Sequence, residues 1–206
     1  MLDQPVPTMT PETLREIYGN PSLKATEKVI TKFDHHCREF IDNATFLVLA
    51  TSDGQNLDIS PKGDPAGIAV VESDSTLLLP DRPGNKRLDG MMNILNHPYV
   101  AAIFLIPTVD ETLRVNGRAE ILDDEKLRAR FEIAGRVPKT VLRITADEIY
   151  THCGKAPMRA GLWKPETWPT SRPVPTLFEM LRDHTCLPIE STDQCDVEKV
   201  YREGLY

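Results

Sequence analysis

Short apolar segments separated by turns are the feature that most limits what this chain can fold into. The segment Thr45–Thr51 (TFLVLAT) has the composition of a buried strand, and the following Ser52-Asp53-Gly54 is a strong hairpin turn. A doubly wound sheet needs a helix between successive strands, and the spacing here does not supply them. The pattern therefore predicts a mainly β fold, an antiparallel barrel of about six or seven strands with peripheral helices. The further predicted strands are Asn56–Ser60, Gly67–Glu72, Thr76–Pro80, Tyr99–Ile106, 112–121 and Thr140–Ala146.

Helical patterns flank these strands. Thr10 before Pro11 is typical of a helix start, and two more helices are expected at about 176–185 and 193–203. We therefore divide the chain into an N-terminal helical arm (1–44), a barrel domain (45–151) and a C-terminal helical tail (152–206). Apolar residues at helical spacing predict a further helix before the barrel, with a core-facing stripe of Phe33, Cys37, Phe40, Ile41 and Ala44.

Composition excludes several classes of function. A formal charge of −7 over 206 residues argues against a general nucleic-acid binder, and the 6% aromatic content is too sparse for a single-strand stacking groove. There is no apolar run of membrane-spanning length and no signal-peptide pattern at the start, so we expect a cytoplasmic protein without a membrane partner. Cys37, Cys153, Cys186 and Cys195 lack zinc-ligand spacing, which predicts reduced thiols and no metal site.

A basic turn carries the most specific chemistry. The stretch TLLLPDRPGNKRLDGMMNILN contains Arg82, Lys86 and Arg87 between an apolar strand and an amphipathic helix, and Asn85 is placed to cap that helix. A helix N-terminus already presents free N–H groups and positive potential, so added cations predict an anionic ligand, first of all a phosphate monoester. A solvated basic turn is the alternative. The core-facing stripe expected for this helix is Leu88, Met91, Met92 and Leu95.

Two other segments offer polar side chains. Lys62 falls in a stretch with two prolines and two glycines, which predicts a shaped loop, although an ordinary surface lysine is the alternative. The strand from 112 alternates between an apolar face and a polar face. This polar face is either solvated or the lining of a ligand groove, and it consists of Thr112, Arg114, Asn116, Arg118 and Glu120.

Taken in order, these segments resemble a known family. The strings ISPKG, LLLPDRPGNKRLD, MMNILNHP and ETLRVNGRAEI are similar to those of the pyridoxamine 5′-phosphate oxidase-related FMN-binding split barrels, over roughly Phe46–Trp163. The nearest likeness is to a subgroup of uncharacterised FMN-dependent flavoproteins with an LLLPDRPGNxRLD signature. The resemblance implies an antiparallel split β-barrel of the FMN-binding type. It also implies a homodimer in which the second chain supplies half of each FMN site.

The resemblance further implies which residues would hold FMN. The family binds the phosphate through a Ser-Arg-Lys turn, which Asn85, Lys86 and Arg87 match. Lys62 matches a basic residue at a strand end. The remaining residues implied near the flavin in this part of the chain are Ser60 and Pro61 beside it and Leu79 and Pro80 at the ring edge.

The resemblance places a second group nearer the isoalloxazine or the substrate. Thr112 falls where the oxidase has a glutamine, and Arg114 is its neighbour on the polar row. Arg159 and Trp163 match tail residues that reach the flavin or substrate across the dimer. From the residues alone, Trp163 and Trp168 fit either buried packing or stacking on a planar ligand.

These features favour an FMN-dependent oxidoreductase that transfers hydride between a small molecule and FMN, with NADH or NADPH as candidate electron donors. The alternative is an FMN-binding module, such as a sensor, storage protein or electron carrier, without its own turnover. A deazaflavin or haem is also compatible with such a barrel. No catalytic side chain is predicted. The oxidase's substrate-phosphate signature is not recognisable in the tail, so the resemblance does not extend to pyridoxamine phosphate as substrate.

Overall fold

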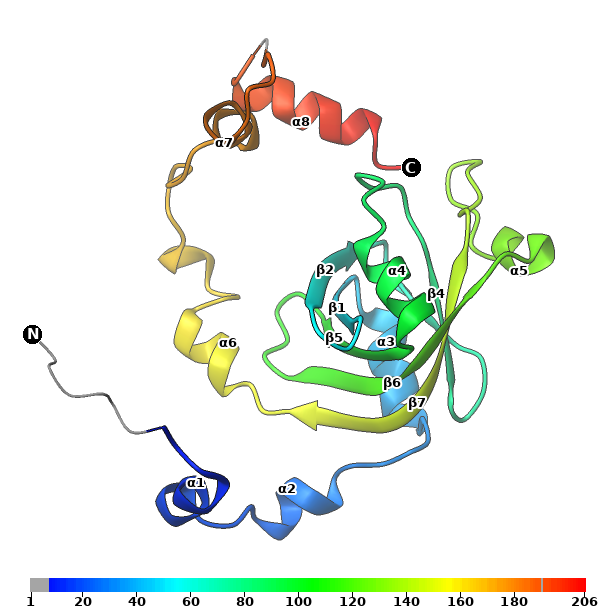
Figure 1. Ribbon diagram of the computed structural model, residues 1–206, viewed down its shortest axis with the longest axis vertical. Coiled ribbons are helices and arrows are strands. Elements are labelled where there is room, and N and C mark those ends of the chain that lie inside the picture. The colour runs from blue at the N-terminus through cyan, green and yellow to red at the C-terminus, as the bar shows by residue number, and fades with distance from the viewer. Residues whose placement is uncertain (1–7, 190) are drawn as a thin grey trace, which may run out of the picture.

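The computed structural model describes residues 8–189 and 191–206. Its centre is a seven-stranded antiparallel sheet with the order β2-β1-β5-β6-β7-β4-β3, which curls around a common core (Figure 1). The end strands β2 and β3 do not pair with each other, so the barrel stays open, and the predicted antiparallel split barrel is confirmed. The strands are β1 (Phe46–Ser52), β2 (Leu57–Gly63), β3 (Val70–Val71), β4 (Thr76–Pro80), β5 (Tyr99–Leu105), β6 (Thr112–Leu122) and β7 (Val141–His152).

Alternation along the strands decides which side chains enter the core. On β1, Leu47 and Leu49 are buried, whereas Phe46 and Val48 lie on the outer face and stay partly exposed. Helix α3 (His35–Asn43) belongs to the same core through its buried side chains, which include Ile41, as its stripe predicted. Each fully buried Leu or Ile contributes about 1.5–3 kcal/mol of transfer free energy. Residues on both sides of the predicted boundary at 44–45, among them Ala44 and Leu47, belong to one hydrophobic cluster.

Gly117 marks an irregularity between β6 and β7. The pairing shifts register between Asn116 and Gly117, because β7 carries one extra residue, Asp147, at this point. A Cβ atom on Gly117 would lie 2.1 Å from the carbonyl oxygen of Thr145. Only glycine allows this close approach of the two backbones, and the bulge keeps apolar residues facing the core on both sides of it.

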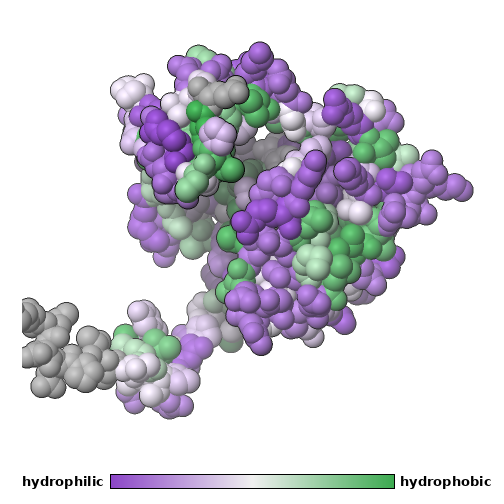
Figure 2. Space-filling view, turned by 45° about the horizontal axis from the view of Figure 1, so that its top comes forward, coloured by the Kyte–Doolittle hydropathy of each residue, from purple (hydrophilic) through white to green (hydrophobic). Residues whose placement is uncertain are grey.

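Helices surround the sheet. After β7 the chain runs in an arc through α6, η1 and α7 before α8 returns toward the loop that follows β4 (Figure 1). The two tail helices expected from sequence are confirmed. In the space-filling view, hydrophobic patches alternate with hydrophilic side chains on the globular body (Figure 2). The peripheral helices are α1 (Pro11–Tyr18), α2 (Leu23–Glu27), α5 (Glu125–Ala129), α6 (Lys155–Ala160), η1 (Pro165–Thr167), α7 (Leu177–His184) and α8 (Gln194–Glu203).

Helix α4 (Asp89–Asn96) packs on β1, β2 and β6, but not through the predicted stripe. Ile94 is its buried residue. Of the predicted stripe, Met91 is half-buried, while Leu88, Met92 and Leu95 are more than half exposed. The prediction was wrong because the helix begins at Asp89, and packing against three strands selects a different face. This leaves an exposed apolar row on α4.

Candidate functional site

A cavity of about 710 Å³ opens where β2, β4 and α4 meet the loop 81–88. Its volume lies in the range of small-molecule and cofactor pockets. The apolar part of its wall includes Leu49, Ile94 and Leu142, while cationic side chains gather on the loop and on the segment before β7. The predicted residues that line this cavity are Ser60, Pro61, Lys62, Leu79, Pro80, Asn85, Lys86 and Arg87.

The loop 81–88 has an unusual backbone. Lys86 and Leu88 have positive φ angles of 63° and 62°, a region that costs a non-glycine residue about 1–2 kcal/mol. Asn85 does not cap α4, contrary to the prediction. Its Oδ1 instead accepts a hydrogen bond of 3.0 Å from the backbone N–H of Arg87, within the loop. The helix begins after the left-handed Leu88, so the segment with Lys86 and Arg87 is a strained turn, a kind of structure that clusters at ligand clamps.

The three basic residues of this turn have different partners. The Arg82 Nε donates to Asp64 Oδ2 at 2.7 Å, and its Nη1 donates to the Phe131 carbonyl oxygen at 2.8 Å. Its side chain and that of Asp64 are only 15% and 5% exposed. Breaking such a buried pair costs about 3–5 kcal/mol, so Arg82 holds the loop in place and is not free for an anion.

Arg87, Arg136 and three lysines supply the accessible positive charge on the cavity wall. The Arg87 Nε donates to Asp89 Oδ2 at 2.7 Å in an exposed ion pair, which solvent weakens. Within residues 8–189 and 191–206, Lys62, Lys86 and Lys139 make no ion pair. All three line the cavity, and the carboxyl of Asp81 lies on the same wall.

Lys62 lies on a strand rather than on the predicted loop. Residues Leu57–Gly63 pair with β1 up to Gly63, and Pro61 is tolerated because β2 is an edge strand. Asp81, which sequence analysis did not single out, lies on the cavity wall beyond β4. Burial raises the pKa of its carboxyl, and Lys62 and Lys139 partly oppose that rise. Its position directly after the LLLP strand was the available sequence signal.

Thr112 and Arg114 lie on β6 outside the cavity, where Thr112 is buried and Arg114 is half-buried. The Arg114 Nη1 donates to the Tyr150 hydroxyl at 3.1 Å, and its guanidinium lies 5.8 Å from the centre of that ring. The rings of Tyr150 and His152 are 5.3 Å apart, and Thr112 pairs with His152 across the strands. Burial lowers the pKa of His152, and the nearby Lys28 and Arg114 lower it further. We call Arg114, Tyr150 and His152 the outer cluster.

The two predicted tail residues do not line the cavity of their own chain. The Trp163 Nε1 donates to the Val109 carbonyl oxygen at 2.9 Å, which holds the half-buried indole beside the β5–β6 connection. Arg159 is exposed on α6. Among the tail residues that the structure describes, Tyr206 lines the cavity, and nothing in its local sequence indicated this position.

Metal ligands and membrane spans do not appear in the described part of the chain. Across residues 8–189 and 191–206, no group of three or more His, Cys, Asp or Glu side chains is arranged to hold a metal ion. No helix in those same ranges is long and apolar enough to cross a bilayer. The four cysteines are free thiols, and burial raises the pKa of Cys37 to about 11.

Similarities to individual known proteins are of limited extent. Peptide deformylase of Wolinella succinogenes is 27% identical over 84 residues, which are 41% of this chain and 45% of that protein, so the match spans less than half of this relative. The HupZ protein of Group A Streptococcus is 20% identical with a TM-score of 0.47, over 58% of this chain and 93% of that one. A putative pyridoxamine 5′-phosphate oxidase of Lactobacillus delbrueckii is 17% identical with a TM-score of 0.47, over 59% and 95% of the two chains.

A match to a family profile covers more of the chain. The profile of pyridoxamine 5′-phosphate oxidase matches residues 33–153, which is more than half of the sequence. The matched region begins before α3 and ends just after β7, so it contains the whole curled sheet and the helix that completes its core. The chain belongs to the pyridoxamine 5′-phosphate oxidase family.

Proposed function

We propose that this chain binds FMN in the cavity beside the loop 81–88 and acts as an FMN-dependent oxidoreductase on a small molecule. The observation that carries the proposal is the convergence of residues from β2, β4 and the loop 81–88 on one cavity wall. These segments are separated along the chain, and each matches a flavin contact of the family on sequence alone.

The residues of the cavity fit the chemistry of FMN. A phosphate monoester carries a charge of about −1.5 to −2 at neutral pH and favours charge-assisted contacts with Lys and Arg. Lys86 and Arg87 provide two cations next to each other on the strained turn. The apolar wall that includes Leu49, Leu79 and Leu142 offers a surface for a flat ring. When bound, FMN supplies hydride acceptance, while the chain binds it, orients it and excludes water.

We also propose that the working unit is a homodimer. The outer faces of β1 and β5 present Val48, Ala50, Ala101 and Ile103, which are apolar and only partly covered. In the cross-strand register, Ile103 lies beside Arg114 of the outer cluster. Residues of β2, which borders this face on the other side, also line the cavity. Within one chain the cavity and the outer cluster are separate. A second copy that covers the apolar face would lie next to both of them.

The first test is the absorption spectrum of the purified protein, with the released cofactor identified by mass. We expect a yellow protein that contains FMN. A colourless protein that fails to take up added FMN would contradict the proposal. Anaerobic addition of NADH or NADPH then separates the two functions, because bleaching of the flavin supports an enzyme. A flavin that neither nicotinamide nor any other donor reduces would instead support a binding module without turnover.

The second test addresses the phosphate. Arg87→Ala should weaken FMN binding by about ten- to a hundredfold, because one charge-assisted contact contributes about 1.5–3 kcal/mol. Riboflavin, which lacks the phosphate, should be affected much less. Arg182→Ala is a matched control, because Arg182 also forms an exposed ion pair with a nearby acid but lies on α7. Equal losses for FMN and riboflavin would show that Arg87 supports the fold and not the phosphate.

A further inference from the structure

Tyr206 connects the tail to the cavity through three contacts. Its hydroxyl donates to Asp64 Oδ1 at 3.0 Å, and the Arg82 guanidinium lies 5.8 Å from the centre of its ring. Its main-chain oxygen accepts a hydrogen bond from Arg136 Nη1. Asp64 thus accepts a hydrogen bond from Tyr206 on one carboxylate oxygen and one from Arg82 on the other. The tail is attached to the same buried ion pair that holds the loop 81–88.

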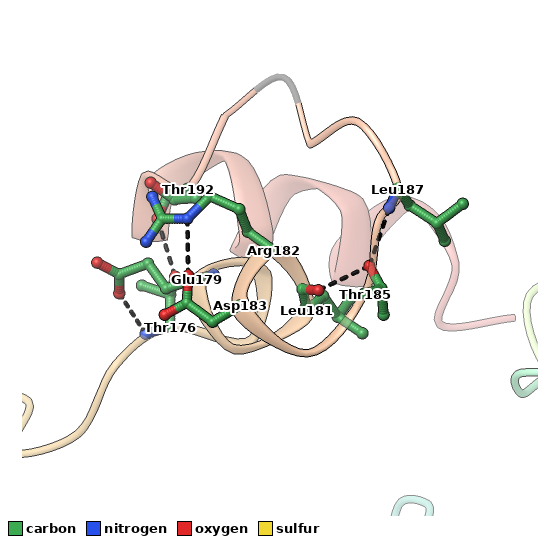
Figure 3. Close-up of polar contacts among 8 residues, drawn as sticks. All are labelled: Thr176, Glu179, Leu181, Arg182, Asp183, Thr185, Leu187 and Thr192. Atoms are coloured by element: carbon green, nitrogen blue, oxygen red, sulfur yellow. Dashed lines mark hydrogen bonds and ion pairs between the residues drawn. The ribbon is translucent and has the colours of Figure 1, made fainter.

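The tail has a framework of its own that positions α8. Thr176 and Glu179 form a reciprocal capping box at the start of α7, and the Thr176 hydroxyl also donates to the Thr192 carbonyl oxygen at 2.9 Å, next to α8 (Figure 3). Val197 is the buried residue of α8. These contacts hold α7 and α8 together. The last turn of α8 and the residues after it, 200–206, therefore lie toward the barrel in a defined position.

The segment 200–206 does not pack tightly on the barrel. A second hollow of about 520 Å³ lies between them, lined on the tail side by Val200, Tyr201, Gly204 and Leu205. On the barrel side this hollow shares several wall residues with the first cavity, among them Lys62 and Pro80. The attachment at this end of the tail is therefore mainly polar and depends on Tyr206. Burial, together with the hydrogen bond to Asp64, raises the pKa of the Tyr206 hydroxyl above its ordinary value.

We propose that Tyr206 is a positioning residue of the cofactor cavity: it fastens the segment 200–206 against Asp64 and Arg82, closes the cavity on that side and slows the escape of the bound cofactor. This inference rests on the proposed binding of FMN. No contact between Tyr206 and the reacting atoms is required. Its effect is on how long the cofactor stays, because an open side wall gives FMN a second route to solvent.

The test is the rate of FMN release, followed by the fluorescence of free FMN after dilution of the loaded protein. Tyr206→Ala should release FMN about tenfold faster, because it loses both the ring and the hydroxyl. Tyr206→Phe keeps the ring over which Arg82 lies and loses only the bond to Asp64, so it should release FMN about threefold faster. Tyr18→Ala is the control, since Tyr18 is 79% exposed on α1 and lines neither hollow.

The same variants separate retention from a structural role. All should keep the wild-type FMN spectrum and one FMN per chain, with melting temperatures close to that of Tyr18→Ala. Release from Tyr206→Ala at the wild-type rate would overturn the inference while leaving FMN binding intact. A wild-type protein that takes up no FMN would overturn the proposed function and this inference together.

A measurement on the unmodified protein decides the case if Tyr206→Ala fails to fold. Amide hydrogen exchange of residues 200–206 in the wild type should slow when FMN is added, because a filled cavity stabilises the closed wall. The amides of α1 should show no change. Exchange in 200–206 that is identical with and without bound FMN would contradict the inference.

Discussion

The cavity wall and the outer cluster both contain residues that the sequence associates with one cofactor site, yet they are built differently. The wall combines a strained turn, an edge strand and unpaired lysines around a hollow. The outer cluster lies on the regular strands β6 and β7, where Arg114 already has Tyr150 as a partner. The wall is thus arranged to receive a ligand by itself, while the cluster presents its side chains outward from the sheet. Under the proposed homodimer, these two regions are half-sites that the second copy joins.

The largest expected effect comes from breaking the surface between the two regions. Ile103→Asp puts a carboxylate into the middle of the apolar outer face, where a second copy would leave it buried without a partner. We expect a monomer in sedimentation velocity and at least about a hundredfold weaker FMN binding. Ile103→Val, which keeps the face apolar, should remain dimeric. A monomeric variant with wild-type FMN affinity would place the complete site in one chain.

A mixed dimer tests the sharing of the site directly. Arg87→Ala removes a cation from the cavity wall, and Arg114→Ala removes one from the outer cluster, each with an expected loss of about ten- to a hundredfold in FMN affinity. In a dimer with one copy of each variant, one of the two sites keeps both arginines. Titration of purified mixed dimers should therefore show one tight and one weak FMN site. Two equally weakened sites would mean that both arginines act within a single chain.

The smallest effect concerns Asp81 and the pH. Burial raises the pKa of its carboxyl, so the ionised form is the disfavoured one, and its negative charge also opposes a bound phosphate. Protonation of Asp81 as the pH falls through this raised pKa removes both penalties. The wild type should thus gain FMN affinity, roughly two- to fivefold, relative to Asp81→Asn over that window.

Titration of the phosphate itself is common to both proteins and cancels in the ratio of their dissociation constants. Folding stability changes in the same direction, because the cost of the buried Asp81 charge is present above the raised pKa and disappears below it. Asp81→Asn should therefore be at least as stable as the wild type at neutral pH. A ratio of FMN affinities that does not change with pH would show that Asp81 does not face the phosphate.

Much of the fold was predictable because its signals are local. The alternation in β1 and the apolar run of β5 require a buried face, and Ser52-Asp53-Gly54 joins neighbouring strands whatever the rest of the chain does. The helix start at Thr10 and Pro11 is confirmed for the same reason, since a cap acts within one turn.

The errors at Asn85, in the stripe of α4 and at Lys62 each come from a feature that single-residue preferences do not contain. Asn85 is a good capping residue, but Lys86 and Leu88 adopt the left-handed conformation, and the helix begins only at Asp89. Single-residue preferences do not predict such a turn, because neither residue is a glycine. The stripe of α4 failed because Ile94 fits against three strands that come from distant parts of the sequence. Lys62 was assigned to a loop because prolines interrupt strands, whereas an edge strand accepts them.

By itself, the sequence determined the strands, the turns between them and the gathering of basic residues at Lys86 and Arg87, because hydrophobic periodicity and turn chemistry act over a few residues. The tertiary structure alone decided which charged side chains form ion pairs and which do not. Arg82 pairs with Asp64, and Tyr206 joins the same carboxylate from the far end of the described chain. An ion pair forms between whichever groups the fold brings within reach and removes from water, so its partners depend on contacts that no local pattern contains.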